Sequence, residues 1–156
     1  LRSFKLDHHR LEVVLTSGGI TFIDDSKATN PHAAIAAIQS QLESIWIAGG
    51  LAKGAAMDEL ARRSKSRIKA AILIGSDATI IQSALLKESP NLAIYMTDSN
   101  LTGIDVMAQV MGIVKNIAVS GDVVLLAPAC ASMDQFKNYA DRGDIFTQAA
   151  KEAFGE

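Results

Sequence analysis

Short, continuous apolar runs alternate along most of the chain with longer stretches in which apolar residues recur at helical spacing. Continuous runs of this length are typical of strands that are buried on both faces of a parallel sheet. The expected strands are Ser44–Ala48, Ala70–Ile74, Leu92–Met96 and Val123–Ala127. The expected helices are Pro31–Leu42, Met57–Lys65, Ala78–Lys87, Asp105–Ala118 and Ile145–Phe154.

Two of these helices carry an apolar face that indicates contact with a core. On the helix at 31–42, this face consists of Ala34, Ile35, Ile38 and Leu42. On the helix at 105–118, it is a stripe of Met107, Ala108, Met111 and Val114. We interpret the stripe on the helix at 105–118 as a core contact rather than as a cofactor site. Asp77 is the expected cap of the helix at 78–87.

The first part of the chain has a different pattern. Leu11–Leu15 and Ile20–Asp24 are β-prone runs on either side of Thr-Ser-Gly-Gly, which indicates a hairpin. After it, strands alternate with helices, as in a parallel sheet with helices on both faces. The pattern therefore predicts one α/β domain over residues 1–156, with a doubly wound, mostly parallel, Rossmann-like sheet and an N-terminal antiparallel hairpin.

Composition narrows the possible functions. The 156 residues are 49% hydrophobic with a net charge of −2, which gives no electrostatic case for binding nucleic acid or an anionic membrane. No apolar run approaches the ~20 residues that span a bilayer. The single cysteine, Cys130, favours the cytoplasm. The chain begins at Leu1 without a methionine, and we expect it to be a piece of a longer protein.

Residues 24–30, Asp-Asp-Ser-Lys-Ala-Thr-Asn, lie between an expected strand and an expected helix. Asn30 is a good N-cap and Pro31 suits the first helical position, so backbone N–H groups should fan out near Lys27 and Thr29. A positive helix terminus beside a lysine makes an anion site, and the neighbouring Asp25 can accept hydrogen bonds from ribose hydroxyls. The alternative is a well-capped loop without a ligand.

Two further segments follow expected strands, and ligands of such sheets bind at the carboxyl ends of strands. Gly-Gly-Leu-Ala-Lys-Gly at 49–54 permits close backbone approach and offers Lys53 to an anion, although its spacing is not that of a P-loop. The segment 128–139 is rich in polar and aromatic groups, and Ser132 or Asp134 is expected to cap a short helix at 134–139. A plain turn and a packed, capped loop are the alternatives.

Other kinds of chemistry lack a matching pattern. Cys130 is expected to be a small buried residue, because no histidine stands near it in sequence to activate it. His8, His9 and His32 do not have a metal-ligand spacing, so no metal site is predicted. Hydrolase signatures such as Gly-x-Ser-x-Gly do not occur.

Four motifs in series resemble one family. They are His-Arg-Leu-Glu at 9–12, Asp-Ser-Lys-Ala-Thr-Asn at 25–30, Gly-Gly with the following Lys53, and Ala-Cys-Ala-Ser-Met-Asp-Gln-Phe-Lys-Asn at 129–138. From about Phe4 to Phe154 the chain is similar to the C-terminal domain of the Mur ligases, and within that family to the members that add D-glutamate to the peptidoglycan precursor.

The resemblance implies a three-domain, ATP-dependent ligase. The two preceding domains would hold the UDP end of UDP-N-acetylmuramoyl-L-alanine, the P-loop, a carbamylated lysine and the ligands of Mg²⁺. The family activates the substrate carboxylate as an acyl phosphate, which the amine of D-glutamate attacks to give an amide, ADP and phosphate. The chain alone is then expected to be inactive, and no catalytic residue is expected in it.

The resemblance also assigns residues. Arg10 is expected to reach the ATP phosphates or ribose, and Asp25 the ribose hydroxyls. The D-glutamate pocket is expected to comprise Lys27, Thr29, Lys53, Ser132 and Tyr139. Two alternatives remain open from the sequence: a Rossmann-like module that binds a nucleotide or sugar phosphate, and the C-terminal domain of another Mur or folylpolyglutamate-type ligase.

Overall fold

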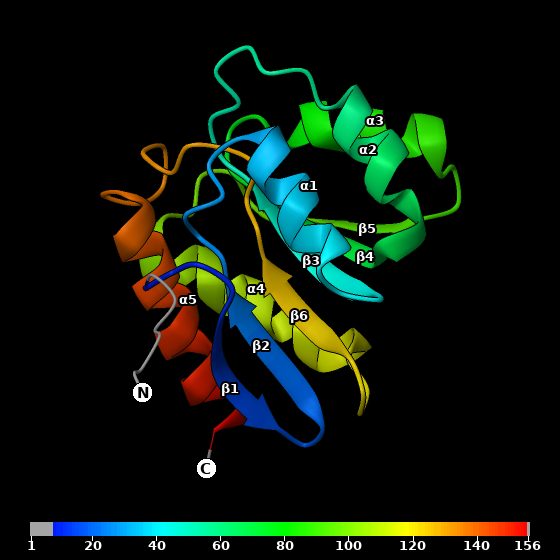
Figure 1. Cartoon of the computed structure of the whole chain (residues 1–156). Coiled ribbons are helices and arrows are strands. Elements are labelled where there is room, and N and C mark those ends of the chain that lie inside the picture. The colour runs from blue at the N-terminus through cyan, green and yellow to red at the C-terminus, as the bar shows by residue number, and fades with distance from the viewer. Residues whose placement is uncertain (1–7, 156) are drawn as a thin grey trace, which may run out of the picture.

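The computed structural model describes residues 8–155. The strands are β1 (Glu12–Ser17), β2 (Ile20–Asp24), β3 (Ser44–Gly49), β4 (Ile68–Ile74), β5 (Ala93–Met96) and β6 (Val123–Leu126). The helices are α1 (Pro31–Gln39), α2 (Asp58–Ser64), α3 (Ala78–Glu88), α4 (Gly103–Ile117) and α5 (Tyr139–Phe154), with a short 3₁₀ helix at Lys65–Arg67. The strands form one six-stranded sheet in the order β1-β2-β6-β3-β4-β5 (Figure 1).

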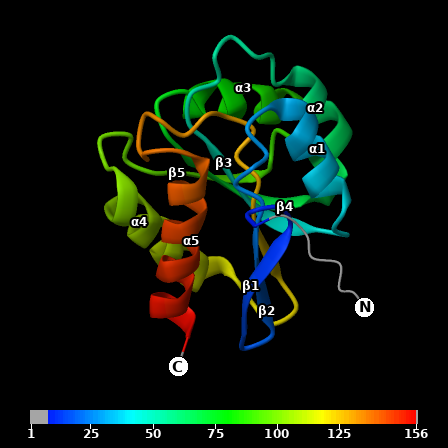
Figure 2. The same ribbon diagram turned by 60° about the vertical axis from the view of Figure 1, so that its left-hand side comes forward.

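The sheet is mostly parallel and doubly wound, as the sequence predicts. Only β1 pairs antiparallel, with β2, and the pairs β2–β6, β6–β3, β3–β4 and β4–β5 are parallel. Helices α1, α2 and α3 cover one face, whereas α4 and α5 cover the other (Figures 1 and 2). The expected hairpin, the later strands and the order of the helices are all confirmed.

The core consists of two layers because the central strands are buried on both sides. On β3, Trp46 and Ala48 face α1–α3, while Ile45 and Ile47 face α4 and α5. Trp46 is fully buried, and its indole N–H donates to the carbonyl of Ala127 at 2.8 Å. This bond ties β3 to the residue that follows β6, at the edge of the sheet where the candidate site lies.

Two helix faces differ from the sequence-based expectation. Helix α1 ends at Gln39, because Ser40 folds back through its N–H and hydroxyl onto α1 carbonyls, and Leu42 beyond it is 90% exposed. On α4 the buried stripe includes Val106 and Val110, while Ala108 is exposed. The helix is thus rotated slightly from the expected face, although its role as a core element is confirmed.

The largest correction concerns residues 134–145. No short helix forms at 134–139, where the chain makes turns and bends, and α5 begins at Tyr139 rather than at Ile145. Asn138 starts the helix: its side chain accepts from the Asp141 N–H at 2.8 Å. Asp77 also differs, since its carboxylate accepts from Ala52 N–H at 2.8 Å instead of capping α3.

We expect Trp46→Phe to lower the free energy of unfolding of the chain by about 2–4 kcal/mol. The change leaves the Ala127 carbonyl without its donor and opens a cavity in a fully buried position. Urea unfolding monitored by circular dichroism measures this. Leu42→Ala, at an exposed position, is the control and should change stability by less than about 0.5 kcal/mol. Equal losses in the two variants would contradict this view of the core.

Candidate functional site

The segments that follow β2, β3 and β6 lie side by side at the carboxyl edge of the sheet. Ala129 N–H donates to the Ala28 carbonyl at 2.9 Å, which joins the segment after β6 to that after β2. Leu51 and Ala131 exchange two backbone hydrogen bonds of 2.9 Å, which join the segment after β3 to that after β6. The structure thus brings together the three segments that the sequence singles out.

Two glycines at the end of β3, its last residue and the one that follows, are required by this close assembly. Gly49 and Gly50 have φ of +124° and +134°, in the region that favours glycine. A Cβ atom on Gly49 would overlap the Ile74 carbonyl, and one on Gly50 would overlap the Ala131 carbonyl. The close approach that the sequence suggests is therefore made, and in this structure it is to the protein's own backbone.

A strap formed by residues 9–11 lies over the segment after β2. Lys27 N–H donates to the His9 carbonyl at 3.1 Å, and Leu11 N–H donates to Asp25 Oδ1 at 3.0 Å. Arg10 stands between these contacts and is exposed. The strap thus places a guanidinium next to the buried carboxylate of Asp25.

Arg10, Asp25 and Lys27 line one cavity of about 210 Å³, which α1 closes on its far side through three alanines. The expected nucleotide pair, Arg10 and Asp25, is therefore together, and Lys27 joins it. Asp25 is 6% exposed, and burial raises the pKa of its carboxyl, with a smaller contribution from the negative charge of Asp24. The hydrogen bond from Leu11 and the charge of Arg10 oppose this rise.

The other residues expected to bind D-glutamate lie on the three loops or, for Tyr139, at the start of α5, and they do not line this cavity. Thr29 and Lys53 are exposed, Tyr139 is half-buried, and Ser132 is 4% exposed. Lys53 has a φ of +51°, which is unusual for a residue with a side chain. The helix terminus expected at Ser132 and Asp134 does not exist: Asp134 accepts instead from Ser76 N–H at 2.9 Å.

Sequence reasoning missed a buried arginine that connects these loops. Arg142 is fully buried, and burial lowers the pKa of its guanidinium to about 10. It donates to the Ser26 hydroxyl and carbonyl, both at 2.8 Å, and to the Cys130 carbonyl at 3.0 Å. The Ser26 hydroxyl in turn donates to the Tyr139 carbonyl at 2.7 Å. Asn138 as the cap of α5 is the sequence signal that would have placed Arg142 within that helix.

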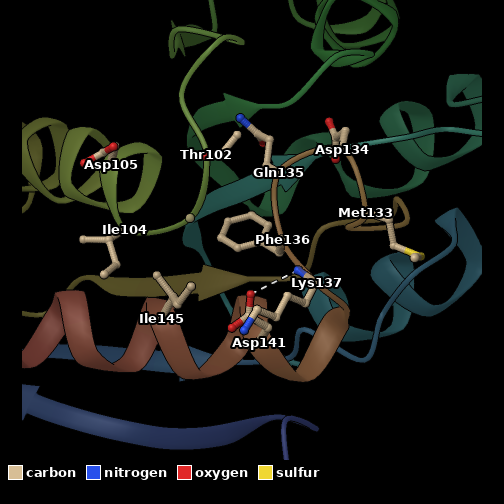
Figure 3. Close-up of a pocket in the computed structure, with 11 residues that line it drawn as sticks. Thr102, Ile104, Asp105, Met133, Asp134, Gln135, Phe136, Lys137, Asp141 and Ile145 are labelled. Carbon is tan, nitrogen blue, oxygen red and sulfur yellow. Dashed lines mark hydrogen bonds between the residues drawn. The ribbon is translucent and has the colours of Figure 1, made fainter.

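A wider hollow of about 710 Å³ lies beside the site, between the start of α4, residues 133–137 and the first turns of α5 (Figure 3). Phe136 forms its floor, and Lys137 N–H donates to the Asp141 carboxylate at 3.1 Å. None of the residues expected to bind substrate lines it.

In the structure, two histidines lie close to a carboxylate, a grouping that the spacing of the histidines did not predict. His8, His9 and Glu12 place potential ligand atoms within 4.8 Å of one another. Their ring nitrogens are already engaged, since His8 Nδ1 is 2.7 Å from Glu12 Oε1 and His9 Nδ1 is 2.6 Å from Asp24 Oδ2. Cys130 is 1% exposed, which confirms it as a small buried residue, and burial raises the pKa of its thiol to about 12.

The strap and the three joined loops place charged groups at the carboxyl edge of a doubly wound α/β domain. Residues 9–130 match the family described as "Mur ligase, glutamate ligase domain", and the chain belongs to this family. Within residues 8–155, no helix is long and apolar enough to cross a membrane.

Among named proteins, the chain is similar to the UDP-N-acetylmuramoylalanine–D-glutamate ligases of Streptomyces avermitilis, Streptomyces coelicolor and Leifsonia xyli, with 47%, 46% and 43% identity. These matches cover 97–99% of the chain but only 30–32% of the relatives, so the chain spans about a third of their length.

Two solved structures share the fold. One is a UDP-N-acetylmuramate-alanine ligase of Thermotoga maritima, with a TM-score of 0.57 and 14% identity over 94% of this chain and 30% of that one. The other is a domain of a putative UDP-N-acetylmuramate:L-alanyl-gamma-D-glutamyl-meso-diaminopimelate ligase of Haemophilus ducreyi, with a TM-score of 0.53 and 20% identity over 90% of this chain and all of that one.

We expect Asp25→Asn to stabilise the chain at pH 7. Because the folded chain holds the Asp25 proton to higher pH than the unfolded chain does, stability is lost as pH rises through the raised pKa. Asparagine does not ionise, so this loss of stability does not occur in the variant, and its side-chain oxygen can still accept the hydrogen bond from Leu11 N–H. Urea midpoints between pH 3 and 8 measure the effect, which should vanish below about pH 3.8, the ordinary value. The exposed Asp58→Asn is the control. A loss of stability that is equal at every pH would contradict the prediction.

Proposed function

We propose that the chain is the C-terminal domain of an ATP-dependent ligase that adds D-glutamate to UDP-N-acetylmuramoyl-L-alanine in peptidoglycan synthesis. The observation that carries the proposal is the convergence of Arg10, Asp25 and Lys27 on one cavity at the carboxyl edge of the sheet. The identity of 47% to a D-glutamate ligase supports the same substrate. The single, buried Cys130 fits the cytoplasmic location that this pathway requires.

In the proposed reaction, ATP converts the substrate carboxylate into an acyl phosphate, and the amine of D-glutamate attacks it to give an amide, ADP and phosphate. We propose no nucleophile from this chain for that step: Cys130 is buried, and the cavity is lined by Arg10, Asp25, Lys27 and apolar residues. Its contribution is to hold the reactants in place. Alignment of an amine against an acyl group can supply roughly 7–11 kcal/mol of the barrier.

Arg10 and Lys27 suit the nucleotide phosphates, and Asp25 suits the ribose hydroxyls. A cavity with two cations and one carboxylate fits phosphate better than Mg²⁺, which prefers several oxygen ligands. One oxygen of Asp25 is also already bonded to Leu11 N–H. We therefore assign Mg²⁺ mainly to the preceding domains, which we also propose to hold the UDP end of the substrate.

For D-glutamate we propose Lys27, Thr29, Lys53, Ser132 and Tyr139. A dicarboxylate needs two anion sites at a fixed separation, and two lysines on separate loops provide them. The joined backbones of the three loops keep that separation constant. Lys27 lies next to both ligands in this arrangement, whereas Lys53 belongs to the amino-acid side.

In the full-length ligase, Lys53→Ala should raise the KM for D-glutamate by about tenfold to a hundredfold and change the KM for ATP by much less. The loss of one charge-assisted hydrogen bond costs about 1.5–3 kcal/mol. Steady-state phosphate release with each substrate varied measures both constants. Lys151→Ala, at an exposed position in the last turn of α5, is the matched control. A lower melting temperature with an unaltered KM for D-glutamate would contradict the assignment. Activity with another amino acid instead of D-glutamate would favour a different Mur or folylpolyglutamate-type ligase.

Arg10→Ala should instead raise the KM for ATP by about tenfold to a hundredfold, because it removes the exposed guanidinium beside Asp25. Its effect on the KM for D-glutamate should be small. Arg63→Ala, on the outer side of α2, is the matched control. An unchanged dependence on ATP would refute the nucleotide assignment and favour a binding module with a different ligand.

A further inference from the structure

The first residue of the strap, His9, forms a buried pair with Asp24, the last residue of β2. The side chains of His9 and Asp24 are 4% and 0% exposed, and His9 Nδ1 lies 2.6 Å from Asp24 Oδ2. Because a carboxylate only accepts, Nδ1 carries the proton. The other oxygen of Asp24 accepts from Ser26 N–H at 2.9 Å. One carboxylate therefore connects the strap to the turn that carries Asp25 and Lys27.

The strap needs such a connection because its backbone is strained. His9 and Leu11 have φ of +69° and +44°, in the left-handed region that residues with side chains rarely adopt. These two residues flank Arg10, so their conformation fixes the direction of its side chain. Without contacts to the turn after β2, the strap would relax toward ordinary backbone angles.

Helix α5 accommodates this pair at Gly143. A Cβ atom on Gly143 would overlap His9 Nδ1 and the Asp24 carboxylate, so the pair rests on the bare backbone of the helix. The Tyr139 ring meets the His9 ring edge-on, with centroids 6.1 Å apart. The pair is thus enclosed by the strap, β2 and α5.

We propose that His9 and Asp24 are positioning residues, which hold the strap in the conformation that presents Arg10 and Asp25 to the nucleotide. The inference rests on the proposed function and deepens it. Neither residue needs to touch ATP: His9 acts through its backbone, which flanks Arg10 and accepts from Lys27 N–H. Asp24 acts through His9 and through Ser26 N–H.

The test compares two amides at position 9 in the full-length ligase. Asparagine places its amide nitrogen near the position of Nδ1 and can still donate to Asp24, whereas glutamine places it near Nε2 and cannot. We expect His9→Gln to raise the KM for ATP about tenfold, since displacement of a binding group by an ångström can cost up to about a hundredfold. His9→Asn should stay within about threefold of the wild type, and both variants should change the KM for D-glutamate less.

Asp24→Ala supplies the second arm, because it removes the same contact from the other side. In the Asp24→Ala background, His9→Gln should have little further effect on the KM for ATP. His32→Gln, on the exposed surface of α1, is the control. If Asp24→Ala does not fold, the comparison of the two amides decides alone.

Equal effects of asparagine and glutamine at position 9, or a fall in melting temperature without a change in the KM for ATP, would overturn the inference. These results differ from a failure of the proposed function. If Arg10→Ala raises the KM for ATP but His9→Gln does not, only the positioning role is wrong. If Arg10→Ala itself has no effect on ATP, the nucleotide assignment fails, and the positioning role fails with it.

Discussion

The candidate site depends on one buried guanidinium. Arg142 is fully buried, and its guanidinium donates hydrogen bonds to the Ser26 hydroxyl and to the carbonyls of Ser26 and Cys130. Burial of an unpaired charge is costly, and hydrogen bonds from the charged group offset that cost. The negative charges of Asp134 and Asp24 favour the cation further. This one side chain connects the loops after β2 and β6 to α5, and it adds to the backbone hydrogen bonds that join the loops to one another.

The loops of the candidate site around Arg142 contain features that lower the stability of the fold. Asp25 is buried with a raised pKa, and His9, Leu11 and Lys53 occupy left-handed backbone regions. Such features persist only when the surrounding contacts impose them, and they concentrate at functional sites. Here they coincide with Arg10, Asp25 and Lys53, residues that the motifs assign to substrate. The strain and the proposed binding roles therefore point to the same loops.

The sequence predicts the sheet well because its strands are continuous apolar runs, and both faces of such a run must be covered. It predicts the segments of the site because polar groups follow those strands at one edge. The prediction from sequence is wrong where a single local contact determines the end of a helix. With Asn138 as its cap, α5 begins at Tyr139, six residues before the apolar pattern does, and Arg142 therefore lay outside the expected helix at 145–154. Leu42 follows the helical period, yet Ser40 ends the helix before it. The pairing of His9 with Asp24 joins residues 15 apart and has no local signal.

Under the proposed function, the exposure of Arg10 calls for a surface that covers the cavity. Arg10 is exposed, and a charge interaction in water is worth only about 1 kcal/mol at 4 Å. The same pair becomes several times stronger when a covering surface excludes water. Under the proposed function, the preceding domains supply that surface. Since Arg142 and the His9–Asp24 pair fix the loops beforehand, closure does not have to order them, and the binding energy remains available to align the reacting groups.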